Sequence, residues 1–376
     1  MDSSSPAAAL TGIALNVATI ACVLLLQRRI GIYAVVLGTT LGLFAQLLVQ
    51  APALLLTRRY RFSIDLRHPG LRRMWEMLGP IIIGSAAGQT ALFFDRYFAS
   101  TLSPGYMAGM NYANKLVNFP QQIFGAAIAT VIFPLLAAHF ARNNRNAVGI
   151  SVTLGLRLVN FITIPSVCAL IVLAHPIVQA LFERGSFGPS STALCAGLLP
   201  FAAVGLIALA ANVVLTRCAF ACNETSWTVT LSVAAVLLNV FLSIEWLPTL
   251  GARGLLLANS ISQTAQALAL IFLLQRLVSK TIDWRALMES AGKIVLCSIV
   301  MVAVLHWIAA LGAHPAATLA ARGWYLFGQI GIGSLAFLAA ARALNVDELF
   351  IIVRLVLEKL ARNVPSAPEN REAPIG

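Results

Sequence analysis

Charged residues are scarce in this sequence. They make up 11% of its 376 residues, whereas apolar side chains make up 59%, and the mean hydropathy is +0.85. Soluble domains are roughly 25% charged, so the composition excludes that class. In place of charge the chain has long apolar runs, each long enough to cross a hydrocarbon core of about 30 Å. We therefore predict an integral membrane protein.

Ten apolar runs of this kind occur along the chain. They lie near residues 8–26, 31–56, 77–99, 107–138, 149–174, 192–216, 227–246, 254–275, 289–311 and 324–344. Continuous apolar runs indicate spanning helices, because the strands of a membrane barrel are short and alternate in polarity. The predicted fold class is an all-α polytopic bundle of about ten transmembrane helices.

The predicted organisation has four parts. They are residues 1–106, the remainder of an N-terminal lobe with a basic loop at 57–76; 107–275, a C-terminal lobe; 276–344, two additional spans; and 345–376, a surface helix with a disordered tail.

Recognisable catalytic and metal motifs are missing as well. The sequence has no nucleophile elbow, phosphate loop or HExxH pair. Its six cysteines all fall inside or at the ends of apolar runs, where a disulfide framework is not expected. Cys218 and Cys222 have helical spacing, but no histidine lies nearby to complete a zinc site. We predict a protein that is not an enzyme and that holds no metal centre or organic cofactor.

Acidic residues are fewer than basic ones. The sequence has 14 Asp and Glu and 26 Lys and Arg, which gives a net charge of +12. The basic residues gather in connections, above all in "TRRYRFSIDLRHPGLRRMWE". The positive-inside rule places that loop in the cytoplasm, and alternation then places both termini there. Anionic lipid headgroups are the nearest partners for this charge, and nucleic acid is not expected.

One run, "NYANKLVNFPQQIFGAAIATVIFPLLAA" at 111–138, is polar in its first half. Lys115 lies about 13 Å into the span, where a charge is costly unless it faces a wet cavity. Asparagines at helical spacing share its side of the helix: Asn111, Asn114 and Asn118. Pro120 breaks the hydrogen-bond ladder. We predict a bent, cavity-lining helix; the alternative is a kinked helix whose polar groups only bind neighbouring helices.

Two more ionisable residues, Asp95 and Arg157, fall inside predicted spans. A further segment of interest follows the last predicted span. Asp95 calls for either a cation or an arginine partner. Arg157 either snorkels to the inner surface or lines the cavity. The tail "NVDELFIIVRLVLEKLARN" is predicted to form an amphipathic helix on the inner surface, with Asn345 as its N-cap.

Four motifs together resemble a known family. "DRYFASTL" from residue 95, "NYANKLVNFPQQIFGAAIATVIFP" from 111, "LFERGSF" from 181 and "GLLLANSIS" from 254 occur in the order and at the spacing of the lipid II flippase family (MurJ/MviN) of the MOP exporter superfamily. Members have fourteen spans, and the ten runs here resemble spans five to fourteen. The resemblance therefore implies that the first four spans, with several cavity arginines and an aspartate, are missing.

The resemblance also implies site residues. Lys115 stands where the family has a cavity arginine, so the charge is kept and the bidentate fork is lost. Asn118 stands where some members have glutamate, and the loop "RCAFACNETSW" lacks the family's usual basic residues and proline. Asp95 and Asn239 match two side chains of the family's sodium site, while Ser243 and Asn259 replace its other aspartate and threonine.

The function that the resemblance implies is movement of undecaprenyl-pyrophosphate-linked peptidoglycan precursor across the bacterial cytoplasmic membrane by alternating access. Lys115, Asn114, Asn118 and Arg157 are the candidate substrate-binding residues, and Na+, H+ or the membrane potential would drive transport. One alternative is a truncated or degenerate chain that is inactive alone or works with a separate N-terminal four-helix segment. Another is an exporter of a different polyprenyl-linked glycan.

Overall fold

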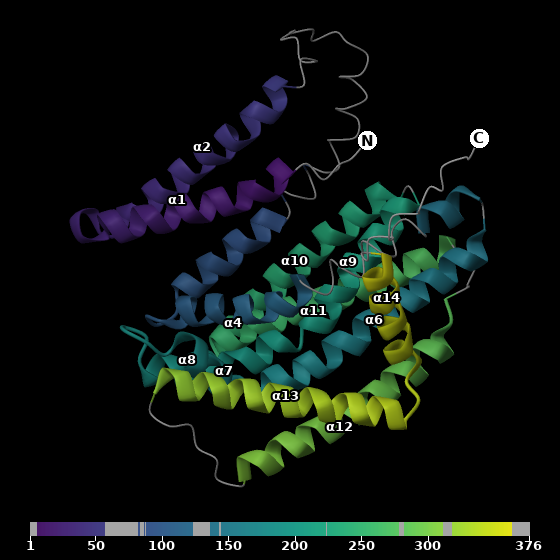
Figure 1. The fold of residues 1–376 in the computed structure, drawn as a ribbon. Coiled ribbons are helices and arrows are strands. Elements are labelled where there is room, and N and C mark those ends of the chain that lie inside the picture. The colour runs from purple at the N-terminus through teal and green to yellow at the C-terminus, as the bar shows by residue number, and fades with distance from the viewer. Residues whose placement is uncertain are drawn as a thin grey trace, which may run out of the picture. The chain divides into compact units, whose positions relative to one another are not determined.

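The structure is a computed structural model that describes residues 6–56, 88–122, 136–142, 144–222, 224–277, 282–310 and 318–362, with the single residues 82 and 86. Within these ranges the regular elements are helices (Figure 1). The chain divides into two compact units, Met1–Met74 and Trp75–Gly376, and each is described by itself.

The first unit is a helical hairpin. Helix α1 (Pro6–Ile30) is joined to α2 (Tyr33–Leu56) by a tight turn at Gly31, whose φ of +57° suits glycine. A side-chain carbon at Gly38 or Gly42 of α2 would lie within 3.0 Å of atoms of α1. Small residues one turn apart let membrane helices approach closely, so these two glycines set the contact between α1 and α2.

The described part of the second unit includes helical residues 88–100 and ten labelled helices. They are α4 (Tyr106–Pro120), α6 (Arg145–Val172), α7 (Ala174–Phe182), α8 (Pro189–Ala203), α9 (Leu206–Ala221), α10 (Thr225–Leu250), α11 (Ala252–Leu277), α12 (Trp284–Ala310), α13 (Leu319–Ala343) and α14 (Asp347–Arg362).

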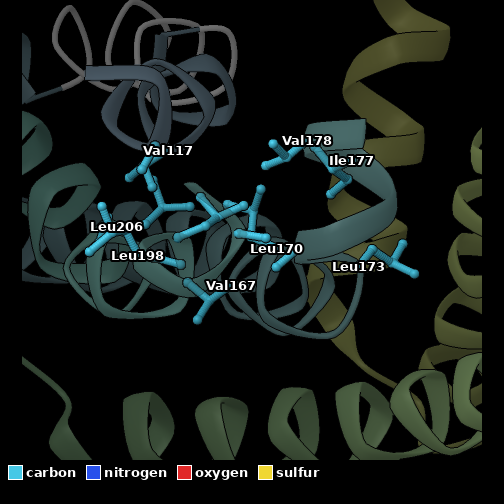
Figure 2. Close-up of a cluster of buried hydrophobic side chains, with 14 of the residues drawn as sticks. Val117, Val167, Leu170, Leu173, Ile177, Val178, Leu198 and Leu206 are labelled. Carbon is cyan, nitrogen blue, oxygen red and sulfur yellow. The ribbon is translucent and has the colours of Figure 1, made fainter. Parts of the chain in front are cut away.

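Two apolar clusters hold this unit together. Figure 2 shows part of the first, where Val117 of α4 lies near Leu198 of α8 and Leu206 of α9, with Val167 of α6 below them and Leu170 of α6 to their right. The second cluster joins the other end of α6 to α9 and α11. Helix α6 contributes to both clusters, as do α9, α11 and α12, and α12 packs along α6 (Figure 1).

The predicted membrane architecture is confirmed. Six described helices are long and apolar enough to cross a membrane: α1, α6, α10, α11, α12 and α13. The bent pair α8 and α9 makes a seventh and corresponds to the predicted run 192–216. Runs 77–99 and 107–138 lie partly outside the described residues, so the count of ten and the boundaries at 106, 275 and 344 stay predictions. The sequence did not predict the short helix α7.

The bend between α8 and α9 measures 44°. Pro200 and Gly205 lie at the bend, where the Gly205 N–H bonds the Ala202 oxygen instead of Phe201. Ser260 of α11 places its Oγ 3.2 Å from the freed Phe201 oxygen while also bonding within its own helix. A side-chain carbon at Gly205 would come within 2.7 Å of that Oγ, so glycine permits the contact.

One predicted helix start is wrong. Asn345 is not the N-cap of α14 but the residue that ends α13, with a φ of +47°. The Val346 N–H bonds the Ala341 oxygen and the Asn345 N–H bonds the Arg342 oxygen, which together form a Schellman motif. Asparagine tolerates this left-handed conformation better than other side chains that carry a Cβ. Helix α14 then begins at Asp347 with two acidic residues in its first turn.

Candidate functional site

Asp95 lies where helical residues 88–100 meet α10 and α11. Asn239 of α10 donates a hydrogen bond from Nδ2 to Asp95 Oδ1 over 3.1 Å, and the Asn259 side chain of α11 hydrogen-bonds the same carboxylate. The structure thus brings three of the four predicted ion-binding residues into direct contact. The sequence predicts either a cation or an arginine as the partner of Asp95. Among the described residues, no arginine forms an ion pair with it.

Two buried oxygens beside this contact lack hydrogen-bond partners. Ser243 follows Asn239 by one turn of α10 and is fully buried. Within the described ranges, Ser243 Oγ and Asn239 Oδ1 accept and donate no hydrogen bond. Leaving a buried polar atom unsatisfied costs about 1–3 kcal/mol, so a ligand that binds oxygen would relieve both atoms.

The donor set is chemically consistent with a hard monovalent cation. It consists of the Asp95 carboxylate, the side-chain amides of Asn239 and Asn259, and the Ser243 hydroxyl. Oxygen ligands suit hard cations, and fewer charged ligands mean weaker binding of divalent ions. The described residues contain no group of three or more His, Cys, Asp or Glu side chains that could hold a transition metal.

A small cleft of about 70 Å³ connects the ion-binding candidates to α4. Asp95 and Asn259 line one side of it, while Asn111 and Asn114 of α4 line the other. Arg96 also borders the cleft and adds a positive charge next to Asp95. One predicted substrate-binding residue, Asn114, therefore shares a cleft with two predicted ion-binding residues.

The polar face of α4 is open. Asn114 and Lys115 are exposed and Asn118 is half-buried, while Ala113 and Val117 of the same helix are buried against the apolar cluster. Lys115 forms no ion pair with any described carboxylate, and its Nζ lies 5.5 Å from the centre of the Tyr112 ring. A lysine with no bound carboxylate remains available to an anionic ligand.

An aromatic cluster that the sequence did not predict fixes the position of α4. Tyr112 packs against Phe182 and Phe187, with ring centres 4.7 and 5.3 Å apart. Both phenylalanines belong to the "LFERGSF" motif between α7 and α8. The motif therefore supports the helix that carries Lys115.

The glutamate of this motif ties α7 and α8 to α13. Glu183 accepts a hydrogen bond from Thr192 over 2.8 Å and pairs with Arg322 over 2.9 Å. The hydrogen bond from Thr192 lowers the pKa of Glu183 most, and Arg322 and Gln179 lower it further. Glu183 is therefore held as a carboxylate by partners from three helices.

Arg157 forms ion pairs within the protein, although a role in substrate binding would require its guanidinium to be available to the substrate. Its guanidinium binds Asp347 over 3.0 Å and also binds Glu348 of α14. Glu348 is only 1% exposed and accepts a second hydrogen bond from Ser290 of α12 over 2.6 Å. The observed role of Arg157 is to attach α14 to α6 and α12, while substrate binding by Arg157 stays a prediction.

Only part of the segment around the predicted bend at Pro120 belongs to the described residues. Helix α4 includes Pro120, and Gln121 continues in helical conformation. Residues 123–135 lie outside the described residues, so the bend also stays a prediction.

The family model and the curated relatives that match this sequence carry the same family description. The family model described as "Lipid II flippase MurJ" matches residues 6–320. The probable lipid II flippase MurJ of Vibrio cholerae serotype O1 is 29% identical over 349 residues, which cover 89% of this chain and 65% of that protein. The lipid II flippase MurJ of Burkholderia cenocepacia is 24% identical over 312 residues, covering 78% and 58%.

Solved structures agree in fold. A lipid II flippase MurJ in an inward closed conformation superimposes with a TM-score of 0.72 at 22% identity, covering 90% of this chain and 67% of that one. An inward-facing multidrug resistance MATE family transporter of the MOP superfamily gives 0.65 at 15% identity, covering 74% and 66%. The chain spans 54–65% of the length of these two curated relatives and of the probable lipid II flippase MurJ of Rhizobium meliloti.

Proposed function

Because the chain belongs to the MurJ lipid II flippase family, we propose that it takes part in moving lipid II across the bacterial cytoplasmic membrane by alternating access. The chain lies in that membrane with several spans, and in this proposal both of its termini are cytoplasmic. Flipping makes and breaks no covalent bond, so the proposed role is that of a transporter for peptidoglycan synthesis.

The observation that carries the proposal is the open polar face of α4. Lys115 is exposed, forms no ion pair with a described carboxylate and lies beside Asn114 on a helix whose opposite face is buried. In the proposed mechanism its ammonium group attracts the pyrophosphate of the substrate as a point charge. Asn114 and Asn118 supply hydrogen bonds to the headgroup, and Arg157 would join them only after releasing α14.

The test replaces Lys115 in cells whose own lipid II flippase can be depleted. We expect Lys115→Ala to abolish the appearance of lipid II in the outer leaflet and Lys115→Arg to retain it, because the charge is what binds. Lys293→Ala is the matched control, since Lys293 forms only an exposed pair with Glu289 over 3.2 Å. Wild-type activity in Lys115→Ala would reject the proposal.

We propose in addition that a monovalent cation is coupled to the cycle. Asp95, Asn239, Ser243 and Asn259 would bind it, and the shared cleft with Asn114 would let ion occupancy alter the polar face of α4. A charge that crosses the full membrane potential supplies about 2.3 kcal/mol per 100 mV. Na+ fits the oxygen donors, while H+ or the membrane potential alone are the competing driving forces.

A second candidate function is that of one part of an assembly. It is favoured by the chain's coverage of 54–65% of its relatives. In this proposal a four-helix segment, in the same protein or in a separate chain, supplies the rest of the cavity. The mass of the endogenous protein and the identity of co-purifying chains test it.

The substrate could also be another polyprenyl-linked glycan. The same Lys115 would bind its pyrophosphate, so the two substrates differ only in the headgroup. Depletion distinguishes them, because the lipid-linked intermediate that accumulates on the inner leaflet identifies the transported glycan.

A further inference from the structure

A second cleft lies between α7, α12 and α13. Its volume is about 250 Å³, slightly below the roughly 300–1,000 Å³ of drug-sized sites. Apolar side chains including Leu173 and Leu305 form part of its wall. Five polar side chains also line it: His175, Gln179, His306, Tyr325 and Gln329. None of them belongs to the proposed transport site.

Gln329 is the residue that indicates a ligand. It lines the cleft from α13, is only 4% exposed, and its Oε1 has no hydrogen-bond donor among the described residues. A buried amide oxygen without a donor is costly. None of the described residues supplies a donor to this oxygen, so a ligand could provide it.

His306 adds a second acceptor. Its Nδ1 lies 3.1 Å from the Val302 oxygen, and because a carbonyl can only accept, Nδ1 carries the hydrogen. In the neutral ring the other nitrogen, Nε2, is then an acceptor. None of the residues that line the cleft is an aspartate or a glutamate. The acceptors on its wall are therefore amide oxygens, a hydroxyl and imidazole nitrogens.

Exposed tryptophans indicate the depth of the cleft. Trp307 and Trp324 follow and precede the cleft residues His306 and Tyr325 in sequence, and they are 67% and 78% exposed. Tryptophan gathers at the level of the lipid headgroups. Both lie towards the ends of α12 and α13 that face the same side of the bundle (Figure 1). The cleft therefore opens at headgroup level.

We propose that this cleft binds the headgroup of a phospholipid that donates hydrogen bonds, either an ethanolamine ammonium or a glycerol hydroxyl. The donor binds Gln329 Oε1 and His306 Nε2, and the Tyr325 hydroxyl donates to the adjacent phosphate. A choline headgroup carries the same charge as ethanolamine but has no N–H, so it leaves Gln329 unsatisfied. The site distinguishes lipids by their donors and not by net charge.

The experiment is native mass spectrometry of the purified full chain titrated with dioleoyl phosphatidylethanolamine, phosphatidylglycerol or phosphatidylcholine. We expect ethanolamine or glycerol lipid to bind about fivefold to tenfold more tightly than the choline lipid, the effect of one to two hydrogen bonds. Preference for the ethanolamine lipid identifies an ammonium donor, and preference for the glycerol lipid identifies a hydroxyl donor. Equal binding of all three lipids overturns the proposal.

Substitutions locate the preference. Gln329→Leu keeps the size of the side chain and removes the acceptor, so it should abolish discrimination against phosphatidylcholine. Gln46→Leu makes the same change in α2 and should retain it. His306→Leu provides a second variant if Gln329→Leu does not fold, and it should reduce the preference. Unchanged discrimination in the folded Gln329→Leu protein, or in His306→Leu where only that variant folds, overturns the assignment.

Discussion

Asn239 Nδ2 lies 3.1 Å from Asp95 Oδ1, although the two residues are 144 positions apart in the chain. The bond leaves Asn239 Oδ1 unpartnered among the described residues, as is the Ser243 hydroxyl one turn further along α10. An amide whose nitrogen is held by an aspartate is oriented to offer its oxygen to a cation. Asp95 and Asn239 therefore act as one unit.

Sodium should stabilise the protein through this unit. We expect NaCl to raise the melting temperature above that in choline chloride of equal ionic strength, because a ligand at 100 times its Kd adds about 2.7 kcal/mol to the free energy of unfolding. Asp95→Asn should remove the difference, and Ser243→Ala should reduce it. Glu289→Gln, a charge change at an exposed site, serves as the control. A sodium effect that survives Asp95→Asn would refute the site.

Loss of Arg157 should destabilise the protein strongly. Arg157→Met leaves the buried Glu348 without its cation, and removing one partner of a buried pair costs about 3–5 kcal/mol. The double variant Arg157→Met with Glu348→Gln should recover part of that loss, because no unpaired charge remains. Lys293→Met breaks an exposed pair and should cost no more than about 0.5 kcal/mol. Denaturant unfolding measures all three variants, and equal losses for Arg157→Met and Lys293→Met would contradict the assigned role.

Acid should weaken the contact at Glu183. Its folded pKa is lowered from the ordinary value of 4.5, first by the hydrogen bond from Thr192. A lowered pKa contributes stability that is fully present above about pH 4.5 and is lost as the pH falls through the folded pKa, because the unfolded chain takes up the proton first. Glu183→Gln should remove this acid-dependent component, while Glu245→Gln at an exposed site should not. The measurement is the melting temperature between pH 7 and pH 3, and identical pH profiles for wild type and Glu183→Gln would disprove it.

Two glycines should respond differently to substitution by alanine. A side-chain carbon at Gly254 would lie 2.7 Å from the Trp246 oxygen, so Gly254→Ala forces α10 and α11 apart and should destabilise the protein. Gly292 in α12 has no described atom within 4 Å of that position. Gly292→Ala should therefore be neutral or stabilise by up to about 1 kcal/mol, the helix propensity of alanine over glycine. Melting temperatures of the two variants decide the point.

The sequence predicted the helices well because membrane spans are specified locally. An apolar run of about 20 residues must form its own hydrogen bonds in lipid, so its existence and type can be read without knowing its neighbours. The amphipathic helix α14 was predicted from a different local signal, the helical spacing of its apolar residues. Its start was not, because Asn345 satisfies the carbonyl groups of α13 through a left-handed conformation that asparagine permits as readily as an N-cap.

Contacts between distant residues were not predictable from spacing. Asp95 and Asn239 were grouped through a family resemblance, and their hydrogen bond supports that grouping. Arg157 was left with two interpretations because its partners lie 190 positions away, in a segment expected to rest on the membrane surface. Gln329 gave no signal at all, since a glutamine in an apolar helix shows its missing partner only after the fold places it against α7 and α12.

The bend between α8 and α9 couples two positions that lie far apart in the sequence, 205 and 260. A broken helix within a membrane commonly needs a water molecule to satisfy the backbone oxygen that the break exposes. Here the hydroxyl of Ser260 stands in for that water at the Phe201 oxygen, and Gly205 leaves it the space to do so. Because a side-chain carbon at position 205 would lie 2.7 Å from this hydroxyl, substitutions at positions 205 and 260 are expected to be energetically coupled.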